Sequence, residues 1–263
     1  MIRTGKKIFI ILVLLFLYAP ILILTVYSFT DATNIGAIRG FSLHNYVTLF
    51  TTPELRNMII GTILLALGSA ALATVLGTMG AIGAFYSKKK VTRFIETLNQ
   101  VPVVNADVVT GFSICILLVV VLGIDKDTFI PLVIGHVTLC APFVYLSVLP
   151  KLKQMDQSIY EAALDLGATP QAALRRIVIP QIFSGIVSGF SLAITLSLDD
   201  YFIATYTKPA TFDTISTYVV NATKGAQTTI KTALWALSAV IFVIVVLIVL
   251  ISNLRANENT ETA

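Results

Sequence analysis

The chain has 263 residues, of which 56% are hydrophobic and only 12% are charged. Soluble domains carry roughly 25% charged residues, so this composition excludes the ordinary soluble globular class and indicates a polytopic membrane protein. The formal net charge of +4 does not indicate nucleic-acid binding, because membrane topology accounts for the placement of the basic residues.

The first predicted element is a transmembrane helix. Arg3, Lys6 and Lys7 precede an apolar run at residues 8–29. A secretory signal peptide is the competing interpretation, but its apolar region has roughly 7–15 residues and a small-residue cleavage site follows it, which this run lacks. We therefore expect an uncleaved first span whose N-terminus is cytoplasmic.

Five further apolar runs are long enough to cross a bilayer as helices. They lie at residues 57–85, 94–122, 129–149, 181–204 and 232–252. Glycines recur in the first of these runs, which indicates close helix packing and a central position for that span. The sequence therefore predicts an all-α polytopic membrane protein with six transmembrane helices.

The predicted organisation has three parts. Residues 1–56 hold the first span and an outer loop, residues 57–252 hold a core of five spans, and residues 253–263 form a tail. Within the core, the polar segment at residues 150–180 connects the fourth and fifth spans. Roughly two thirds of the 18 Lys and Arg residues fall in segments placed inside, as the positive-inside rule requires. We therefore expect this segment and both termini to be cytoplasmic.

The polar segment predicts two short helices bent about a glycine. Ser158 and Glu161 form a capping box that begins the first helix, and Gly167 can take the left-handed conformation that ends it. Thr169 and Pro170 begin the second helix as N-cap and first helical residue. Pro180 stops that helix or leads into the next span. The apolar stripe of the first helix follows positions i, i+3, i+4 and i+7, which are Ile159, Ala162, Ala163 and Leu166.

The spacing in this segment resembles a known motif. It contains Glu161-Ala162-Ala163, three residues, Gly167, nine residues and Ile177-Val178-Ile179-Pro180. This pattern resembles the EAA loop of ABC importer permeases, with Ile179 where that family usually has Leu. The alternative is an amphipathic helix pair that packs only on its own domain.

The resemblance implies the type I ABC importer permease fold and a set of partners. In that family the loop docks into a cleft on a cytoplasmic ATPase. It implies two ATPase subunits that bind ATP and Mg²⁺, a second homologous permease, an extracytoplasmic solute-binding protein and contact with membrane lipid, but no nucleic acid. The residues assigned to coupling are Ile159, Glu161, Ala162, Ala163, Leu166, Gly167, Ile177 and Pro180.

No motif indicates that this chain is an enzyme. It contains no phosphate loop of the form G-x-x-x-x-G-K-[ST], no nucleophile motif and no Cys/His cluster with metal spacing. We therefore expect a transport subunit with no catalytic residues, metal or cofactor of its own. The isolated His136 favours hydrogen-bonded packing over a role as ligand.

Three acidic residues lie inside or at the mouth of predicted spans: Asp107, Asp199 and Asp200. An ionised side chain at the bilayer centre costs about 2.5–3.5 kcal/mol on insertion scales. Carboxylates that face a water-filled passage would favour a cationic solute, with Tyr201 near the outer mouth. Each acid has a structural alternative, in which it pairs with polar neighbours or reaches interfacial water.

Further stretches narrow the resemblance. FSLHNY at residues 41–46, Asn105-Ala106-Asp107 and SLDD at residues 197–200 resemble the second permease subunit of spermidine/putrescine importers. This resemblance implies polyamine transport across the bacterial cytoplasmic (inner) membrane. The alternatives are an ABC permease for iron, thiamine, sulfate or another solute, an ATP-independent secondary transporter or channel, and a membrane scaffold without cargo.

Overall fold

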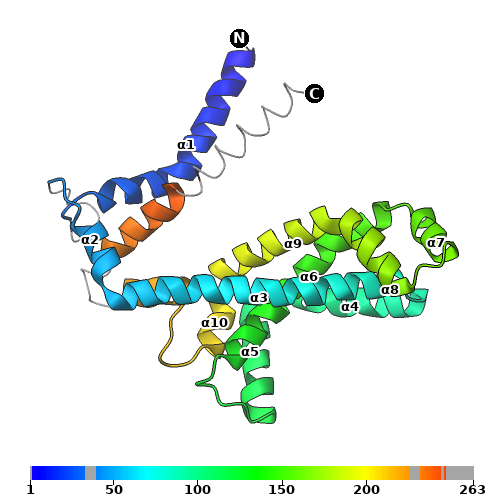
Figure 1. Ribbon diagram of the computed structural model, residues 1–263. Helices are drawn as coiled ribbons and strands as arrows, with labels where there is room; N and C mark the ends of the chain where they lie inside the picture. The colour runs from blue at the N-terminus through cyan, green and yellow to red at the C-terminus, as the bar shows by residue number, and fades with distance from the viewer. Residues whose placement is uncertain (1, 33–39, 225–231, 244–245, 247–263) are drawn as a thin grey trace. The chain divides into compact units, whose positions relative to one another are not determined.

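The computed structural model describes residues 2–32, 40–224, 232–243 and 246, and the fold is all-α. Within these residues, extended backbone pairs only at an isolated antiparallel bridge between Thr30 and Phe41. The named helices are α1 (Ile2–Ser28), α2 (His44–Thr51), α3 (Pro53–Phe85), α4 (Lys89–Val104), α5 (Asp107–Cys115), η1 (Ile116–Val121), α6 (Ile130–Gln154), α7 (Gln157–Asp165), α8 (Pro170–Ala173), η2 (Leu174–Val178), α9 (Ile179–Asp199), α10 (Phe202–Thr207) and α11 (Ile215–Lys224). Here η1 and η2 are π-helical, and Figure 1 draws the helices as coiled ribbons.

The chain divides into two compact units. One comprises the described residues of Met1–Asn57 and Val219–Ala263, and the other is Met58–Tyr218. The predicted tail at residues 253–263 lies outside the described residues.

Four described helices are long and apolar enough to cross a membrane. They are Lys6–Ser28, Pro53–Phe85, Ile130–Gln154 and Pro170–Asp199, and a bent helix pair makes a fifth candidate. Part of the predicted sixth span forms a shorter apolar helix, Thr232–Val243, and most of its remainder lies outside the described residues. The polytopic all-α class is therefore confirmed, whereas the described residues contain at most five candidate spans.

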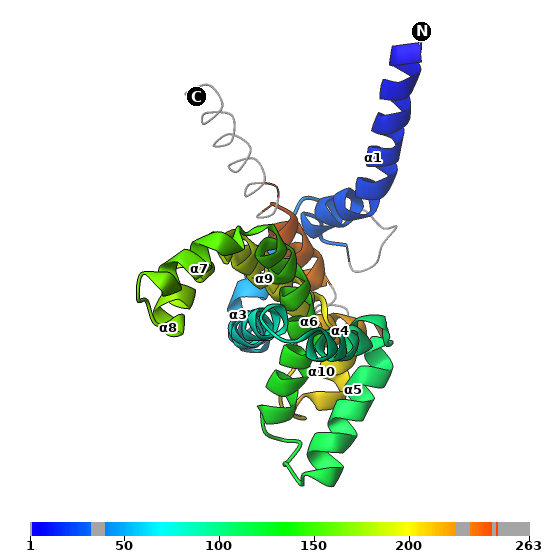
Figure 2. The ribbon, with the colours of Figure 1, turned by 90° about the vertical axis from the view of Figure 1, so that its right-hand side faces the viewer.

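The predicted third span is broken rather than continuous. Helices α4 and α5 meet at an angle of 106°. Pro102 lies in the last turn of α4, and Asn105 and Ala106 have extended backbone. Proline removes a helix hydrogen bond, so the helix is weakened close to the point where it ends. Figure 2 looks along α3 and α4 and shows α5 crossing that direction.

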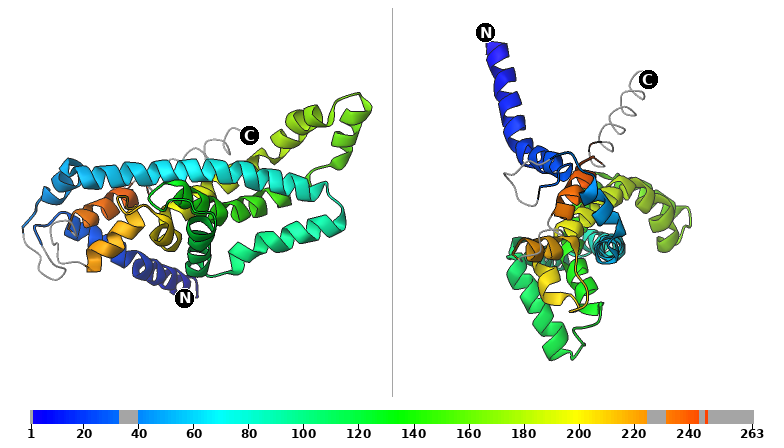
Figure 3. Two further views of the ribbon diagram at one scale, coloured as in Figure 1. Left: turned by 90° about the horizontal axis from the view of Figure 1, so that it is seen from below. Right: turned by 90° about the vertical axis from the view of Figure 1, so that its left-hand side faces the viewer.

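Helix α6 is the centre of the second unit, although α3 was expected to be. More of α6 than of α3 is buried. Gly77 brings α3 against α6, because a Cβ there would lie 2.7 Å from both the Ala141 carbonyl oxygen and the Val144 Cβ. Gly189 also lets α9 approach α6 closely, since a Cβ there would lie 3.1 Å from the Val144 Cα. Figure 3 (left) shows α4 running back from the end of α3, and α4 packs on α6.

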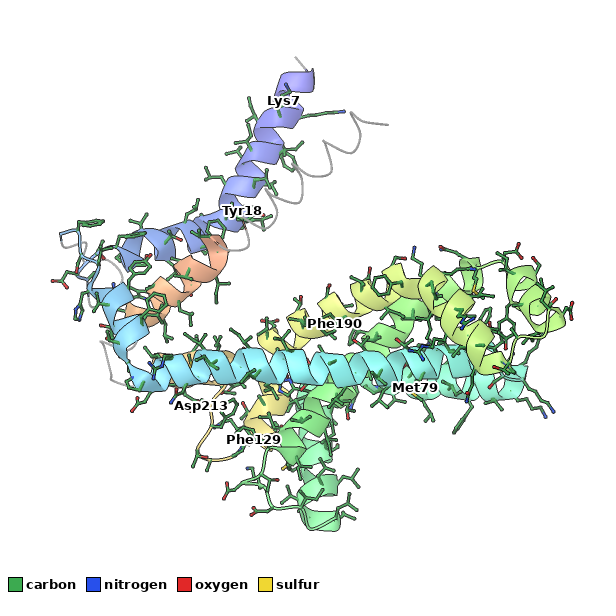
Figure 4. The ribbon with its side chains drawn as sticks, viewed as in Figure 1. Lys7, Tyr18, Met79, Phe129, Phe190 and Asp213 are labelled. Carbon is green, nitrogen blue, oxygen red and sulfur yellow. The ribbon has the colours of Figure 1, made fainter. Side chains whose placement is uncertain are left out.

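The fifth span ends earlier than predicted. Helix α9 stops at Asp199, and the chain turns through Asp200 into the short helix α10. A Cβ on Gly111 of α5 or Gly135 of α6 would come within 3 Å of Ile203. These two glycines therefore let α10 pack directly on α5 and α6. In the same unit, the ring of Phe129, which is labelled in Figure 4, is in edge contact with the ring of Phe212 at 5.2 Å.

In the first unit, the segment after α1 is fixed by hydrogen bonds. The Asn45 amide of α2 donates to the carbonyl oxygens of Ser28 and Thr30, each at 3.1 Å. The Tyr46 hydroxyl bonds the Ser28 hydroxyl at 2.8 Å. The amide and hydroxyl of the FSLHNY stretch thus satisfy polar groups at the end of α1.

Candidate functional site

The two-helix insert begins at Asp156, two residues before the predicted cap. The Asp156 carboxylate accepts a hydrogen bond from the Ser158 backbone N–H at 2.9 Å, and this lowers the pKa of Asp156. Asp and Ser are both good N-cap residues, and here the backbone places Asp156 in the cap position. The predicted capping box of Ser158 and Glu161 is therefore wrong, although the helix itself is present.

Gly167 ends α7 as predicted, with a φ of +86°. The Gly167 N–H donates to the Leu164 carbonyl at 2.9 Å, and the Ala168 N–H donates to the Ala163 carbonyl at 3.0 Å. This pair of bonds is the Schellman motif, which closes the C-terminal carbonyls of a helix around a left-handed residue. The bend of the insert is therefore set by hydrogen bonds and a glycine conformation.

The second half of the insert joins the fifth span without a break. Thr169 caps α8 by accepting from the Ala172 N–H at 3.3 Å, with Pro170 as first helical residue, as predicted. Helix α8 continues through η2 directly into α9, and Pro180 lies in the first turn of α9. Of the two roles considered for Pro180, leading into the next span is therefore the one observed.

One side of α7 packs on the protein and the other is exposed. The Tyr160 ring lies 5.1 Å from that of Tyr86, beyond the end of α3, so the insert lies where α3 passes into α4 (Figure 1). On the predicted apolar stripe, Leu166 is 89% exposed and Ile159 is 45% exposed. Ala162 and Glu161 are also exposed, whereas Ala163 and Ile177 are half-buried.

The insert therefore presents an apolar surface that this chain leaves uncovered. Ile159, Ala162 and Leu166 form this surface, which we call the α7 stripe. The half-buried Ile177 and the fully buried Val178 anchor η2 to the protein. An exposed apolar stripe on a firmly attached helix is suited to bind in the groove of a partner protein.

The second group of predicted site residues lies where α9 turns into α10. The Asp200 side chain is only 3% exposed. Its carboxylate oxygens accept hydrogen bonds from the backbone N–H groups of Ile203 at 3.2 Å and Ala204 at 2.7 Å. Asp200 therefore fixes the turn between the two helices, which is the structural alternative considered for it.

His136 completes a buried polar cluster with Asp200. His136 Nδ1 and the Ser197 hydroxyl are hydrogen-bonded at 2.8 Å, and His136 Nε2 lies 3.6 Å from an Asp200 carboxylate oxygen. His136 is fully buried, so the expectation of hydrogen-bonded packing is confirmed. The cluster ties together α6, α9 and the start of α10.

Asp107 and Asp199 are placed differently from Asp200. Both are exposed, and the negative charges of both act on Asp200, so the structure brings the three acids into one neighbourhood. Asp107 is the first residue of α5, where a negative charge is favoured by the helix dipole.

Tyr201, the other residue predicted for the substrate path, is half-buried, with its ring 5.2 Å from that of Phe202. Among the described residues, no group of three His, Cys, Asp or Glu side chains is placed to hold a metal ion.

Most of the chain matches one known protein family. Residues 73–257 match the family described as binding-protein-dependent transport system inner membrane component. The chain belongs to this family. It is therefore a multi-pass inner-membrane permease of the ABC importer class, a transport subunit rather than an enzyme. The matched region includes the whole insert and all three acids.

Curated relatives include polyamine permeases. The chain is 33% identical to the putrescine transport system permease protein PotI of Escherichia coli K12 over 211 residues, covering 78% of this chain and 75% of PotI. It is 29% identical to the spermidine/putrescine transport system permease protein PotC of Haemophilus influenzae over 254 residues, covering 97% of each chain. The resemblance to the second permease of spermidine/putrescine importers is thus confirmed.

A solved structure has the same fold. A crystal structure of a bacterial ABC transporter involved in the import of the acidic polysaccharide alginate superposes with a TM-score of 0.75 at 20% identity. The superposition covers 97% of this chain and 95% of that one. At this identity the likeness concerns the fold alone.

Proposed function

We propose that this chain is one permease subunit of an ATP-driven importer that carries a polyamine such as spermidine or putrescine into the cytoplasm. The α7 stripe is the observation that carries the ATP-driven part. Leu166 is 89% exposed on a rigid, capped corner, and together with Ile159 and Ala162 it forms a contiguous apolar surface that a partner protein can bury. A partner that covers the stripe gives it a role.

The proposed partner at this surface is a cytoplasmic ATPase. The Schellman motif and the two N-caps fix the shape of the insert. A displacement of α7 by the partner would therefore move η2 and α9 with it. Helix α9 packs along α6, the centre of the unit. We propose that two such ATPase subunits bind the ATP and Mg²⁺.

The proposed cargo path runs past the exposed acids. Asp107 and Asp199 are available to a solute, whereas Asp200 is committed to the turn before α10. Carboxylates in a low-dielectric passage attract polyammonium ions more strongly than they do in bulk water. Polyamine transport by PotI and PotC supports the same class of cargo.

The remaining partners follow from the family. An exposed insert on each permease suits a core of two permeases, so we propose a second homologous permease beside this chain. We also propose an extracytoplasmic solute-binding protein, which the family description implies and which a periplasmic protein represents in a second crystal structure of the alginate transporter.

Purification of the tagged chain from gently solubilised membranes tests the proposed assembly. We expect an ATPase subunit to co-purify in stoichiometric amount and to be lost when Leu166 is replaced by Glu. An ATP-independent secondary transporter is the rival, and it predicts that the chain reconstitutes solute uptake alone. Uptake by the isolated chain without any ATPase would overturn the proposal.

A further inference from the structure

A second candidate site lies in the membrane-spanning helices, and none of the three acids is among its lining residues. Helices α3, α4 and α6 line an open groove with a volume of about 390 Å³. This volume is within the range of small-ligand sites. None of the residues that line the groove is charged, and most are apolar. Gly80 of α3 keeps one wall open, because it places no side chain over the Tyr145 ring.

A buried hydroxyl without a partner marks this groove as a binding site. The Tyr145 side chain is part of the lining, and Tyr145 is 3% exposed. Its hydroxyl makes no hydrogen bond with any described group. Buried polar groups are nearly always paired, so an unpaired one beside a cavity indicates a missing ligand or solvent partner.

Two prolines add acceptors to the same groove. Pro102 of α4 and Pro142 of α6 both line it, and each lacks the N–H that would bond the carbonyl four residues earlier. Those carbonyls belong to Leu98 and Thr138, which are lining residues as well. Two lining residues on different helices therefore each carry a backbone carbonyl that lacks its usual helix donor.

The last polar group in the groove also leaves an acceptor free. The Asn99 amide nitrogen donates to the Pro142 carbonyl at 3.4 Å, which leaves the Asn99 Oδ1 to accept. The polar atoms that remain are mainly acceptors, set among apolar walls. An anion would find only the Tyr145 hydroxyl and the second Asn99 N–H as donors, whereas a protonated amine, with three donors and no acceptor, can use all of the acceptors.

We propose that this groove binds the alkyl-ammonium end of the cargo during its passage, with the ammonium at the Tyr145 hydroxyl and the Leu98 and Thr138 carbonyls. The methylene chain lies on the apolar walls, and the tyrosine ring adds a cation–π contact. The lining residues are all uncharged, so binding is weak, as conduction requires, since a solute must also leave. The inference rests on the proposed polyamine cargo but concerns different residues from the acids.

Cysteine protection in the complete transporter tests the groove. After Cys115 and Cys140 are replaced, Thr138→Cys is labelled in proteoliposomes with a methanethiosulfonate carrying an ethylammonium group, with and without spermidine. Thr97→Cys is the matched control, because Thr97 is an exposed residue of α4 outside the groove. We expect spermidine to slow labelling several-fold at residue 138 and not at residue 97.

Reagent charge supplies a second measurement that does not depend on transport. The ratio of labelling rates for the ethylammonium reagent and the ethylsulfonate reagent should be higher at residue 138 than at residue 97. Equal ratios, or no labelling at residue 138 because lipid or a helix of the second permease fills the groove, would overturn the inference.

If the parent complex imports spermidine while residue 138 is unprotected, the assignment of the groove is wrong and the proposed function stands. If the parent imports no polyamine, the proposed function fails, and the charge ratio still decides the groove.

Variants of the lining provide a kinetic test in the same complex. We expect Tyr145→Phe to raise the KM for spermidine several-fold with a smaller change in kcat, because the hydroxyl is removed and the packing is kept. Gly80→Leu should fill the groove and block uptake, whereas Gly83→Leu should not, since Gly83 is exposed on the same helix outside the groove. Unchanged uptake in both Tyr145→Phe and Gly80→Leu would contradict the assignment.

Discussion

At the scale of single residues, Gly167 fixes the geometry on which coupling depends. A Cβ added there meets nothing within 4 Å, so a substitution acts through the φ of +86° alone. A left-handed conformation costs an alanine roughly 1–2 kcal/mol. We predict that Gly167→Ala weakens ATPase association in co-purification and lowers uptake while the permease is inserted normally, and that Gly167→Asp abolishes uptake.

Gly83→Ala is the matched control for this prediction. A Cβ at Gly83 also meets nothing within 4 Å, but its φ is ordinary. The control variant should therefore couple like the parent. Equal ATPase association in the Gly167 and Gly83 variants would mean that the bend does not position the docking surface.

Replacing each of the three acids by its amide should affect either uptake or stability, depending on the position. Asp107→Asn and Asp199→Asn are predicted to lower spermidine uptake with little loss of stability, because both side chains are exposed. Asp200→Asn removes a charged acceptor from two backbone N–H groups, which destabilises the folded permease by about 1–3 kcal/mol. Thermal unfolding of the solubilised chain, measured beside uptake, distinguishes the two effects. Parent-like uptake in both exposed-acid variants would make those residues structural.

The different position of Asp200 illustrates what the sequence can and cannot specify. Asp199 and Asp200 are neighbours in one polar pair, and a helix places neighbours about 100° apart, so at most one of them faces a given path. Which one turns inward depends on where α9 ends, and no glycine or proline marks that point. His136, 61 positions from its partner Ser197, was assigned only to packing, because one sequence carries no record of long-range pairs.

At the scale of elements, the α7 stripe is the part most open to test. Leu166 is almost fully exposed, so Leu166→Ser should leave the free permease as stable as the parent. Burying a leucine on docking is worth about 1.5–3 kcal/mol, which corresponds to roughly a 10–150-fold change in dissociation constant. We predict a loss of ATPase affinity in this range, measured by titration of the solubilised complex. Gln171→Ser, on the exposed part of α8, should have no such effect, and equal affinities in the two variants would contradict the docking role.

The insert was the most predictable element, and the third span the least. Gly167, Thr169 and Pro170 act through local backbone chemistry, so their roles could be read from their types and spacing. The N-cap was displaced to Asp156 because two competent caps lie two residues apart and only the backbone decides between them. The break at residues 105–106 was missed, since the apolar run continues past Pro102 and proline alone does not distinguish a kink from a bend of 106°.

At the scale of the whole molecule, the proposed topology places both termini and residues 150–180 in the cytoplasm. A cysteine at Ser158, in a background without Cys115 and Cys140, should be protected from an impermeant maleimide in intact cells. It should react after the membrane is opened, because Ser158 is exposed on the insert. A cysteine at Lys126, exposed in the predicted outer turn between η1 and α6, should react in intact cells. Labelling of the Ser158 position from outside would overturn this orientation.

The polytopic all-α class was predictable because hydropathy is distributed along the whole chain, and the permease family because its motif is local in sequence. Hydropathy indicates the spans, and the EAA-like spacing indicates the family. The central position of α6 was not predictable, because the glycines at 77, 185 and 189 act by contact with partners far away in sequence. The residues that line the α3–α4–α6 groove likewise converge only in the folded chain.

ATP-dependent uptake of labelled spermidine tests the central claim most directly. The complete complex, with this chain, its second permease, both ATPases and the solute-binding protein, is reconstituted in proteoliposomes. We predict that spermidine accumulates only with ATP and Mg²⁺ on the ATPase side, that excess putrescine competes, and that excess sulfate does not. Accumulation without ATP, or transport of sulfate with no transport of spermidine, would contradict the account.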